Sequence, residues 1–416
     1  MLHGRGTLAL AVLGVLAVSV PRATAQAQPP LAVVVDPYMM PASGAIDLLT
    51  AQQALTTVED RWLPPRRFDE STPVTRTLGI AYRFAKWFGL DLPQDHFLMV
   101  VGHEVFGHGA RLREVGASGI RYHFDAPIPY GGGGASTEFD GEVRVARADV
   151  LAVDTAGIEA QNAIADAIGR RALAGGALPY REAWLYLESR LAGLGYIRSV
   201  SPHSEPGHDV ASFLLDLNDG CDPPACQPLR GSMLKRRALL MLADPLLAAS
   251  VYGWAASYLV RGDTALVVPT IPLPRDIRYL PAIRFEMTPY GTEWTTEHNF
   301  AVDGRLTSVS VRIGDASGTR AWGVGVVADA IVRRERVTAG VTADLWRQPA
   351  LDAPPNPKEL ATGALAMGIA KLALGHRAPV DRAGVYVQGG YKSAGFVRGE
   401  RLHAGPILRV GITFSR

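Results

Sequence analysis

Cysteine is almost absent from this chain, which has only Cys221 and Cys226 among its 416 residues. That number excludes a fold held together by a network of disulfides. The two cysteines enclose a short Pro-rich turn, Cys-Asp-Pro-Pro-Ala-Cys, and in an exported protein such a pair usually forms a local disulfide. A metal-binding pair is the alternative, and it is disfavoured because the loop contains no histidine.

An excess of charge of either sign is also missing. The chain has 42 basic and 40 acidic residues, a net charge of +2. It has neither a basic stripe nor basic residues interleaved with aromatic ones, so nothing in it indicates a nucleic-acid partner. A glycine-rich phosphate-binding motif is absent too, although residues 131–134 are four consecutive glycines. That run is expected to be a loop or hairpin tip, or a mobile rim that offers an edge strand to an extended peptide.

Long hydrophobic runs are scarce, and the first lies at the N-terminus. Arg5 precedes the apolar stretch 7–20, and small-residue cleavage motifs follow near Ala25 and Ala27. We expect residues 1–27 to be a secretory signal peptide, with an uncleaved anchor as the alternative. The second run, residues 234–260, contains charged side chains and the break Asp244-Pro245, which favours two packed core helices over a membrane span.

The hexapeptide at positions 103–108 reads His-Glu-Val-Phe-Gly-His and is the most informative motif of the chain. Neutral imidazoles are common zinc ligands, and a neighbouring carboxylate can act as a general base. His103 and His108 are five residues apart, however, so a regular helix would turn them about 140° away from each other. A π-bulge would restore their alignment, and Gly107 is where such a distortion is easiest. The alternative is a buried helix with two unrelated histidines.

This H-E-x-x-G-H pattern resembles the extended motif of the dipeptidyl-peptidase III family of zinc peptidases. The resemblance implies a third ligand, a glutamate from a second helix, and Glu159 lies 51 residues after His108. It covers only these two short segments, and the paired glutamates of the family's second motif are absent, since Glu159 follows an isoleucine. We therefore take from it a gluzincin-like ligand set, and not dipeptidyl specificity. His123, Asp125 and Asp154 are rival third ligands.

With His103, His108 and Glu159 as metal ligands, Zn²⁺ would keep one open position for water, the arrangement of catalytic rather than structural zinc sites. Glu104 is the expected general base. His208 is the expected stabiliser of the developing oxyanion, with His203 and Tyr130 as other candidates. The sequence thus predicts a zinc metallopeptidase that cleaves peptide bonds in a cell envelope. The alternatives are a zinc hydrolase acting on a non-peptide amide, and a non-enzymatic outer-membrane or envelope protein with a structural or vestigial zinc site.

The periodicity of the apolar residues divides the chain into a helical half and a strand-rich half. Residues 28–270 are expected to form a mainly α-helical, zincin-like domain, and residues 275–416 an antiparallel β-barrel, a two-domain α+β protein. Helices are expected over residues 46–58, 73–89, 91–116, 149–173, 180–194, 209–217 and, as two helices, 234–260. Strands are expected over residues 279–290, 292–302, 305–314, 320–332, 335–347, 361–375, 382–397 and 404–415.

Eight consecutive strands with short turns indicate an up-and-down barrel of eight strands. Several of them alternate apolar side chains with small or polar ones, a pattern similar to that of outer-membrane barrels, whose outer band contacts lipid. Phe414 lies close to the C-terminus, as an aromatic residue does in many such barrels, although this chain ends Phe-Ser-Arg. We expect an outer-membrane protein with its helical domain in the periplasm, or a periplasmic protein in which a soluble barrel packs on the helices.

Overall fold

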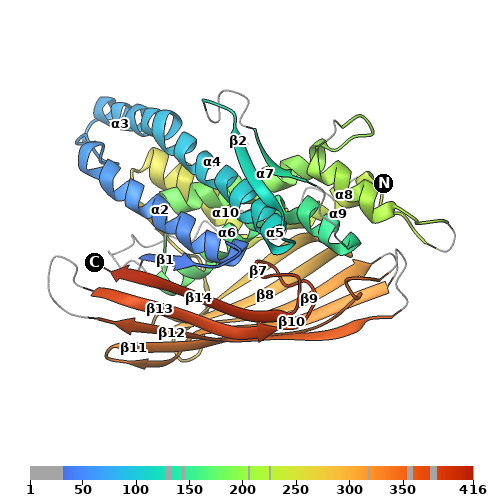
Figure 1. The fold of residues 1–416 in the computed structure, drawn as a ribbon. Helices are drawn as coiled ribbons and strands as arrows, with labels where there is room; N and C mark the ends of the chain where they lie inside the picture. Colours follow the sequence, from blue (N-terminus) through green and yellow to red (C-terminus); the bar gives the residue numbers. More distant parts are fainter. Residues whose placement is uncertain are drawn as a thin grey trace, which may run out of the picture.

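The computed structural model describes residues 31–127, 134–141, 146–204, 207–223, 226–316, 319–353, 359–374 and 382–415. The expected signal peptide and Tyr130 lie outside these residues. Helices fill the N-terminal half of the described chain and long antiparallel strands fill the C-terminal half, so the predicted α+β class is confirmed. Figure 1 shows the helices as one layer and the strands as a second layer beneath them.

The helical half follows the start and stop signals of the sequence. Its helices are α2 (Pro41–Trp62), α3 (Pro73–Lys86), η1 (Trp87–Asp91), α4 (Leu92–Val101), η2 (Gly102–His108), α5 (Gly109–Glu114), α6 (Arg147–Gly175), α7 (Tyr180–Ser199), α8 (Asp209–Asn218), α9 (Gly231–Ala238), η3 (Leu239–Ala243), α10 (Pro245–Tyr252) and η4 (Gly253–Val260). At α3 the Thr72 hydroxyl accepts a hydrogen bond from the N–H of Thr75 at 3.2 Å, and Pro73 is the first helical residue. This is the capped start expected from the sequence.

The apolar run 234–260 forms separate helices, as expected. Pro245 is the first residue of α10, and the carboxylate of Asp244 accepts a hydrogen bond from the N–H of Leu246. In the described part of the chain no single helix has both the length and the apolar composition to cross a membrane. The pair Gly231–Ala243 and Pro245–Val260 passes that test only when the two are taken together across a 64° bend.

The C-terminal half contains all eight predicted strands, each within a few residues of its expected bounds. They are β7 (Ile277–Thr288), β8 (Gly291–Val302), β9 (Arg305–Ala316), β10 (Thr319–Arg334), β11 (Val337–Gln348), β12 (Ala361–Ala373), β13 (Arg382–Lys392) and β14 (Gly405–Ser415). Every strand pairs antiparallel with the next one in sequence. The two-residue connections that join β7 through β11 leave few other pairings available to these strands.

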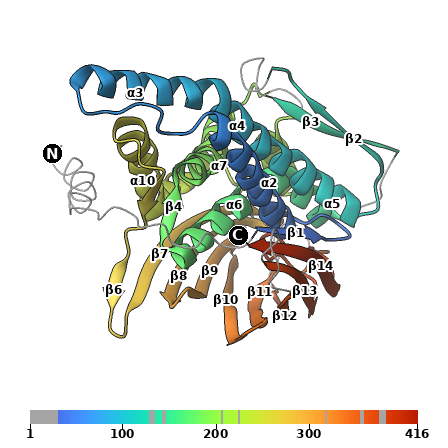
Figure 2. The same cartoon turned by 90° about the vertical axis from the view of Figure 1, so that its left-hand side faces the viewer.

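The predicted closed barrel is wrong. The described strands form an open sheet of ten, because β1 (Leu31–Val35) pairs with β14 and β6 (Ile271–Leu273) pairs with β7. β1 pairs along β14 and β6 pairs with the first residues of β7, so β7 and β14 do not pair with each other to close a barrel. Figure 2 shows the result, a sheet curved like a trough around α2 and α6.

Two short two-stranded sheets complete the fold. One pairs β2 (Ser118–Phe124) with β3 (Ala135–Asp140), and the other pairs β4 (Ala177–Pro179) with β5 (Ala265–Val267). The expected disulfide between Cys221 and Cys226 is present. The largest hydrophobic core contains buried residues of both halves, including Ile164 and Ile168 of α6 and Leu280 of β7. Helices and sheet therefore share one core, and α6 packs between the sheet and the other helices.

Candidate metal centre

The helix that contains the 103–108 motif widens where the sequence predicted it. Residues Gly102–His108 form a π-helix, η2, between α4 and α5. The N–H of Gly109 donates to the carbonyl oxygen of Glu104, five residues earlier, in place of the usual partner four residues earlier. The widened turn is thus confirmed, and it removes the angular mismatch between the two histidines.

The two imidazoles meet at one point together with a carboxylate from α8. The Nε2 atoms of His103 and His108 are 3.2 Å apart, and Oδ2 of Asp209 lies 3.1 Å from the first and 3.2 Å from the second. Ligands about 2.0–2.1 Å from a tetrahedral zinc ion are about 3.3 Å from one another. The three atoms therefore form a triangle of the size that one zinc ion requires. Their side chains are 11–16% exposed, so the centre is nearly buried and still reachable by solvent.

The ring of His108 is held in the orientation that a ligand needs. Its Nδ1 lies 2.8 Å from the carbonyl oxygen of Val153 in α6. A carbonyl oxygen can only accept, so Nδ1 carries a proton, and Nε2 is the nitrogen that can offer a lone pair to a metal once it has lost its own proton. Backbone contacts of this kind orient metal-binding histidines and fix their tautomer.

Two glycines let η2 approach α6 closely enough to form the centre. A Cβ atom on Gly157 of α6 would lie 2.2 Å from Nε2 of His103, and one on Gly107 would lie 2.6 Å from the carbonyl oxygen of Ala156. Neither position has room for a side chain. The motif in η2 and the segment around Gly157 therefore pack directly against each other.

The opposite charges at the centre stabilise one another and shift each other's pKa values. Burial alone would lower the pKa of His108, but the charge and hydrogen bond of Asp209, the charge of Glu104 and the hydrogen bond to Val153 together raise that pKa to about 9. In return, although burial acts in the opposite direction, the imidazoles of His108 and His103 hold the pKa of Asp209 well below its usual range. The carboxylate is thus ionised over the whole physiological range, as a metal ligand must be.

Glu159, the expected third ligand, does not lie at this centre. Both of its carboxylate oxygens accept hydrogen bonds at 2.7 Å from Nη2 of Arg111, and one also accepts from the N–H of Gly399. The physical reason is helical geometry. Gly157 faces His103, and two residues further along an α-helix the side chain points about 200° away. Glu159 therefore ties α6 to α5 and to the loop before β14, and Asp209 occupies the place expected for it.

Glu104, the expected general base, lies beside a short edge strand. The hydroxyl of Thr137 in β3 donates to Oε2 of Glu104 at 2.5 Å. In the described part of the chain β3 pairs only with β2, so its other edge has no strand partner. The carboxylate of Glu104 is thus in contact with a side chain of a strand that has one unpaired edge.

The structure describes two of the three expected oxyanion stabilisers, His208 and His203. His208 directly precedes Asp209, stacks on the ring of Tyr196 with centroids 4.3 Å apart, and contacts the hydroxyl of Ser199 through Nε2 at 3.1 Å. It is not one of the three clustered side chains. His203 lies on the exposed loop before α8, where its N–H donates to the Ser201 hydroxyl. Tyr130 lies outside the described residues.

The rival third ligands are also placed away from the cluster. His123 is exposed on β2 and lies 3.5 Å from the carboxylate of Glu138. Asp125 is exposed at the end of the same strand. Asp154 faces Asp216, and burial together with that carboxylate raises the pKa of Asp154 to about 8. None of the three belongs to the group of side chains that could share one ion.

Two residues of the centre had no signal that singled them out in the sequence. Asp209 begins α8, where an acidic residue is common for purely helical reasons. Tyr196 lies near the end of α7, its ring centroid is 6.2 Å from that of His103, and its hydroxyl accepts the N–H of Asp209 at 3.1 Å. Burial and the charge of Asp209 raise the pKa of Tyr196 to about 12, so the phenol keeps its proton.

Comparisons with models of known protein families, with curated protein sequences and with solved structures gave no match for this chain. The donor atoms of the centre indicate which metal it suits. Two imidazole nitrogens and one carboxylate oxygen are a donor set suited to zinc, whereas magnesium and calcium prefer oxygen donors alone. Among the described residues, His103, His108 and Asp209 are the group whose donor atoms could hold one metal ion.

Proposed function

We propose that this protein is a zinc-dependent hydrolase, and specifically a peptidase, with His103, His108 and Asp209 as its metal ligands. The observation that carries the proposal is the convergence of these three donors next to Glu104. A purely structural zinc site is usually closed by four protein ligands, whereas a catalytic site uses three and leaves one position open. The described cluster supplies three.

Glu104 is proposed as the general base. It immediately follows His103 in the widened turn, and its carboxylate is close enough to His108 to contribute to the raised pKa of that imidazole. A bound zinc ion would supply Lewis acidity, lowering the pKa of a coordinated water and polarising the scissile carbonyl. The carboxylate of Glu104 would take the proton from the attacking water and later give it to the leaving amine. The Thr137 hydroxyl, which donates to Oε2, holds the carboxylate in place.

Tyr196 is proposed as the group that stabilises the oxyanion. Its raised pKa keeps the hydroxyl protonated, and its oxygen already accepts a hydrogen bond from the backbone of Asp209, which leaves its own proton to be donated. His208 stacks against the Tyr196 ring and therefore acts as a positioning residue rather than as the donor.

An extended peptide is the substrate that the surroundings favour. The free edge of β3 can pair with a peptide backbone as an additional strand, a common mode of peptide recognition. Thr137 belongs to that strand and contacts the general base, so a paired peptide would run past Glu104. A non-peptide amide would have no use for such an edge.

The test compares Glu104→Gln with Glu335→Gln, a control in the β10–β11 turn. Glu335 is exposed and lies outside the metal centre and the proposed peptide-binding strand. The zinc content of each purified full-length protein and the cleavage of a quenched fluorescent peptide library are measured. We expect both variants to keep zinc and Glu104→Gln alone to lose hydrolysis by about 10²–10⁴-fold. Zinc-loaded wild type that cleaves no peptide would instead favour the non-enzymatic envelope protein.

A further inference from the structure

The large sheet has its polar and apolar faces reversed relative to those of a water-soluble protein. The face that packs against the helices contains buried charged side chains, among them Glu293, Arg312 and Arg409. These are paired: Arg312 with Asp344, and Arg409 with Glu400 at 2.6 Å. In a soluble two-layer protein the sheet turns its apolar side toward the helices and its polar side toward water.

The opposite face is exposed and apolar. Strand register places its side chains in continuous rows, because residues paired across neighbouring strands point to the same side. Exposed large hydrophobic residues occur on strands β8–β14 and β1, and they include Leu408 at 62%, Ile313 at 57% and Ile412 at 52% exposure. Further members of this outer face are Val33, Val35, Trp294, Val311, Trp322, Val324, Val326, Val341, Leu345, Val387, Val410 and Phe414.

The outer face is far larger than the apolar patches of ordinary soluble proteins. Eight strands spaced about 4.8 Å apart, over an apolar height of about 25 Å, give an area of roughly 1,000 Å². The largest patch on a typical soluble monomer is about 300–600 Å². A surface of this extent requires a partner that covers it.

Along the strands, the apolar part of the outer face forms a band that ends at charged residues on both sides. On β11, the flanking arginines Arg336 and Arg347 are eleven positions apart, and the outward residues between them are Ala339, Val341, Ala343 and Leu345, together with Val337. Eleven residues of strand span about 37 Å, or about 28 Å across a membrane at the usual tilt near 40°. This is close to the thickness of the hydrocarbon core of a bilayer, about 30 Å.

The residues at the two ends suit the polar borders of a bilayer. Trp294 and Trp322 lie in one row through Ile313, and Trp322 is paired with Arg347. Tryptophan is enriched at membrane interfaces, and arginine attracts anionic lipid headgroups. At the opposite end, the exposed Arg333, Arg334 and Arg336 surround the β10–β11 turn. Charge at both ends therefore complements lipid headgroups.

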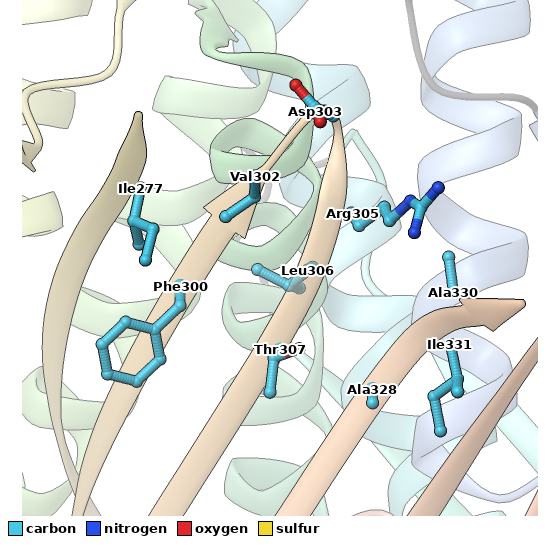
Figure 3. A pocket seen from close by; sticks show the side chains of 10 residues that line it. All are labelled: Ile277, Phe300, Val302, Asp303, Arg305, Leu306, Thr307, Ala328, Ala330 and Ile331. Atoms are coloured by element: carbon cyan, nitrogen blue, oxygen red, sulfur yellow. The ribbon is translucent and has the colours of Figure 1, made fainter. Parts of the chain in front are cut away.

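Near that opposite end, the outer face contains an apolar hollow of about 440 Å³. Figure 3 shows Ile277, Phe300 and Ile331, from three different strands, around it. Asp303 and Arg305 belong to the turn at its border. An apolar hollow with charged groups at its border fits an acyl chain beneath a headgroup.

Near both ends of the sheet, helix side chains form hydrogen bonds with strand backbone groups that have no strand partner. At β1, Thr50 of α2 accepts from the N–H of Ala32 and donates to its carbonyl oxygen, and Asp47 accepts from the N–H of Val34 at 2.7 Å. Such capping matters because an unpaired strand edge is not tolerated in hydrocarbon.

The part of β7 beyond its short pairing with β6 also bonds to helix side chains. Arg190 of α7 donates to the carbonyl oxygen of Ile283 at 3.0 Å, and Asn162 of α6 donates to that of Phe285 at 3.3 Å. The helices thus do for the open sheet part of what closure does for a barrel.

From these observations we propose that the outer face of the β8–β14 and β1 strands contacts the hydrocarbon chains of a lipid bilayer. A second copy of the chain fits less well. The face is on the convex side of the curved sheet (Figure 2), and two convex surfaces can touch only along a narrow strip. Fluid lipid covers a convex surface of any width. The proposal is independent of the metal centre.

The first test places a fluorescent label at the middle of the band. Ala343→Cys and the control Glu335→Cys, in the β10–β11 turn, are labelled with an environment-sensitive dye, since the native cysteines form a disulfide and leave no free thiol. Full-length protein is mixed with vesicles of phosphatidylethanolamine and phosphatidylglycerol, and quenching by aqueous iodide is measured. We expect quenching at position 343 to fall at least fivefold on addition of vesicles, and quenching at position 335 to change little.

Two outcomes would overturn the proposal. Label at position 343 that stays fully open to iodide in the presence of vesicles would show that the face remains in water. Label that is shielded without lipid, in a species of twice the monomer mass, would show that a second copy covers the face.

A second test uses charge. Val341→Arg, at the midpoint of the band, should reduce recovery with floated vesicles by roughly thirtyfold or more relative to Glu335→Arg. Val341 is exposed, so the substitution should leave the far-ultraviolet circular dichroism spectrum unchanged. Equal recovery of the two variants would contradict lipid contact.

Discussion

Replacement of Gly157 by alanine is expected to remove zinc while leaving the fold intact. The added Cβ would lie 2.2 Å from Nε2 of His103. A normal contact requires about 3.4 Å, so the imidazole would have to move by more than 1 Å, whereas zinc distances tolerate only about 0.2 Å. The centre would lose one of its two imidazoles, and we expect zinc affinity to fall at least 100-fold, the upper range for loss of a supporting group.

The effect of Gly157→Ala on stability should be small by comparison. Alanine in place of glycine within a helix stabilises by up to about 1 kcal/mol, whereas overpacking a core costs about 1–3 kcal/mol. These terms oppose each other, so the net change in the free energy of unfolding should be within about 2 kcal/mol. The variant should therefore remain folded and be testable.

Gly169→Ala is the matched control, because Gly169 lies on the same helix and its Cβ would meet Leu246 at 3.3 Å, far from the histidines. Zinc affinity is measured by competition with a chelator, and stability by thermal unfolding of the metal-free proteins. Gly169→Ala should bind zinc like wild type. If Gly157→Ala bound zinc as tightly as wild type, His103 would not be a ligand in the position described.

Other predictions concern the ligands and their protons. Asp209→Asn should lower zinc affinity at least tenfold, whereas Glu159→Gln should keep zinc and lower the melting temperature, because it weakens the buried pair with Arg111; the reverse pattern would restore Glu159 as the third ligand. In the metal-free protein the pKa of His108 is about 9, above the unfolded value of 6.5. Its contribution to stability is therefore complete below about pH 6.5 and is lost as the pH rises through about 9. Zinc must displace that proton, so its affinity should rise about tenfold per pH unit between about pH 7 and pH 8, and a flat profile would contradict the raised pKa.

Local pattern was sufficient for most elements of the fold. The alternation of apolar and polar residues located the eight strands β7–β14, and the two-residue connections among β7–β11 oblige those neighbouring strands to pair. The alternation and the connection lengths could not determine whether the sheet closes into a barrel. Whether β14 pairs with β7 or with another segment depends on the far end of the chain, and the short strand Leu31–Val35 takes that edge.

The candidate metal centre was likewise predictable only in part. The five-residue spacing of His103 and His108 required a widened turn, and the turn is present. The third group was not predictable from spacing, since Asp209 follows His108 by 101 positions and comes from another helix. Glu159 was inferred from a resemblance between two short segments, and the rotation of α6 fixed by Gly157 turns it toward Arg111 instead.

The measurement that tests the account most directly is anomalous X-ray diffraction at the zinc edge from crystals of the full-length protein grown with zinc. One strong peak is predicted about 2.0–2.2 Å from Nε2 of His103, Nε2 of His108 and a carboxylate oxygen of Asp209. A fully loaded crystal with no peak at this point, or with its peak beside Glu159 and Arg111, would contradict the proposed metal centre and the hydrolase built on it.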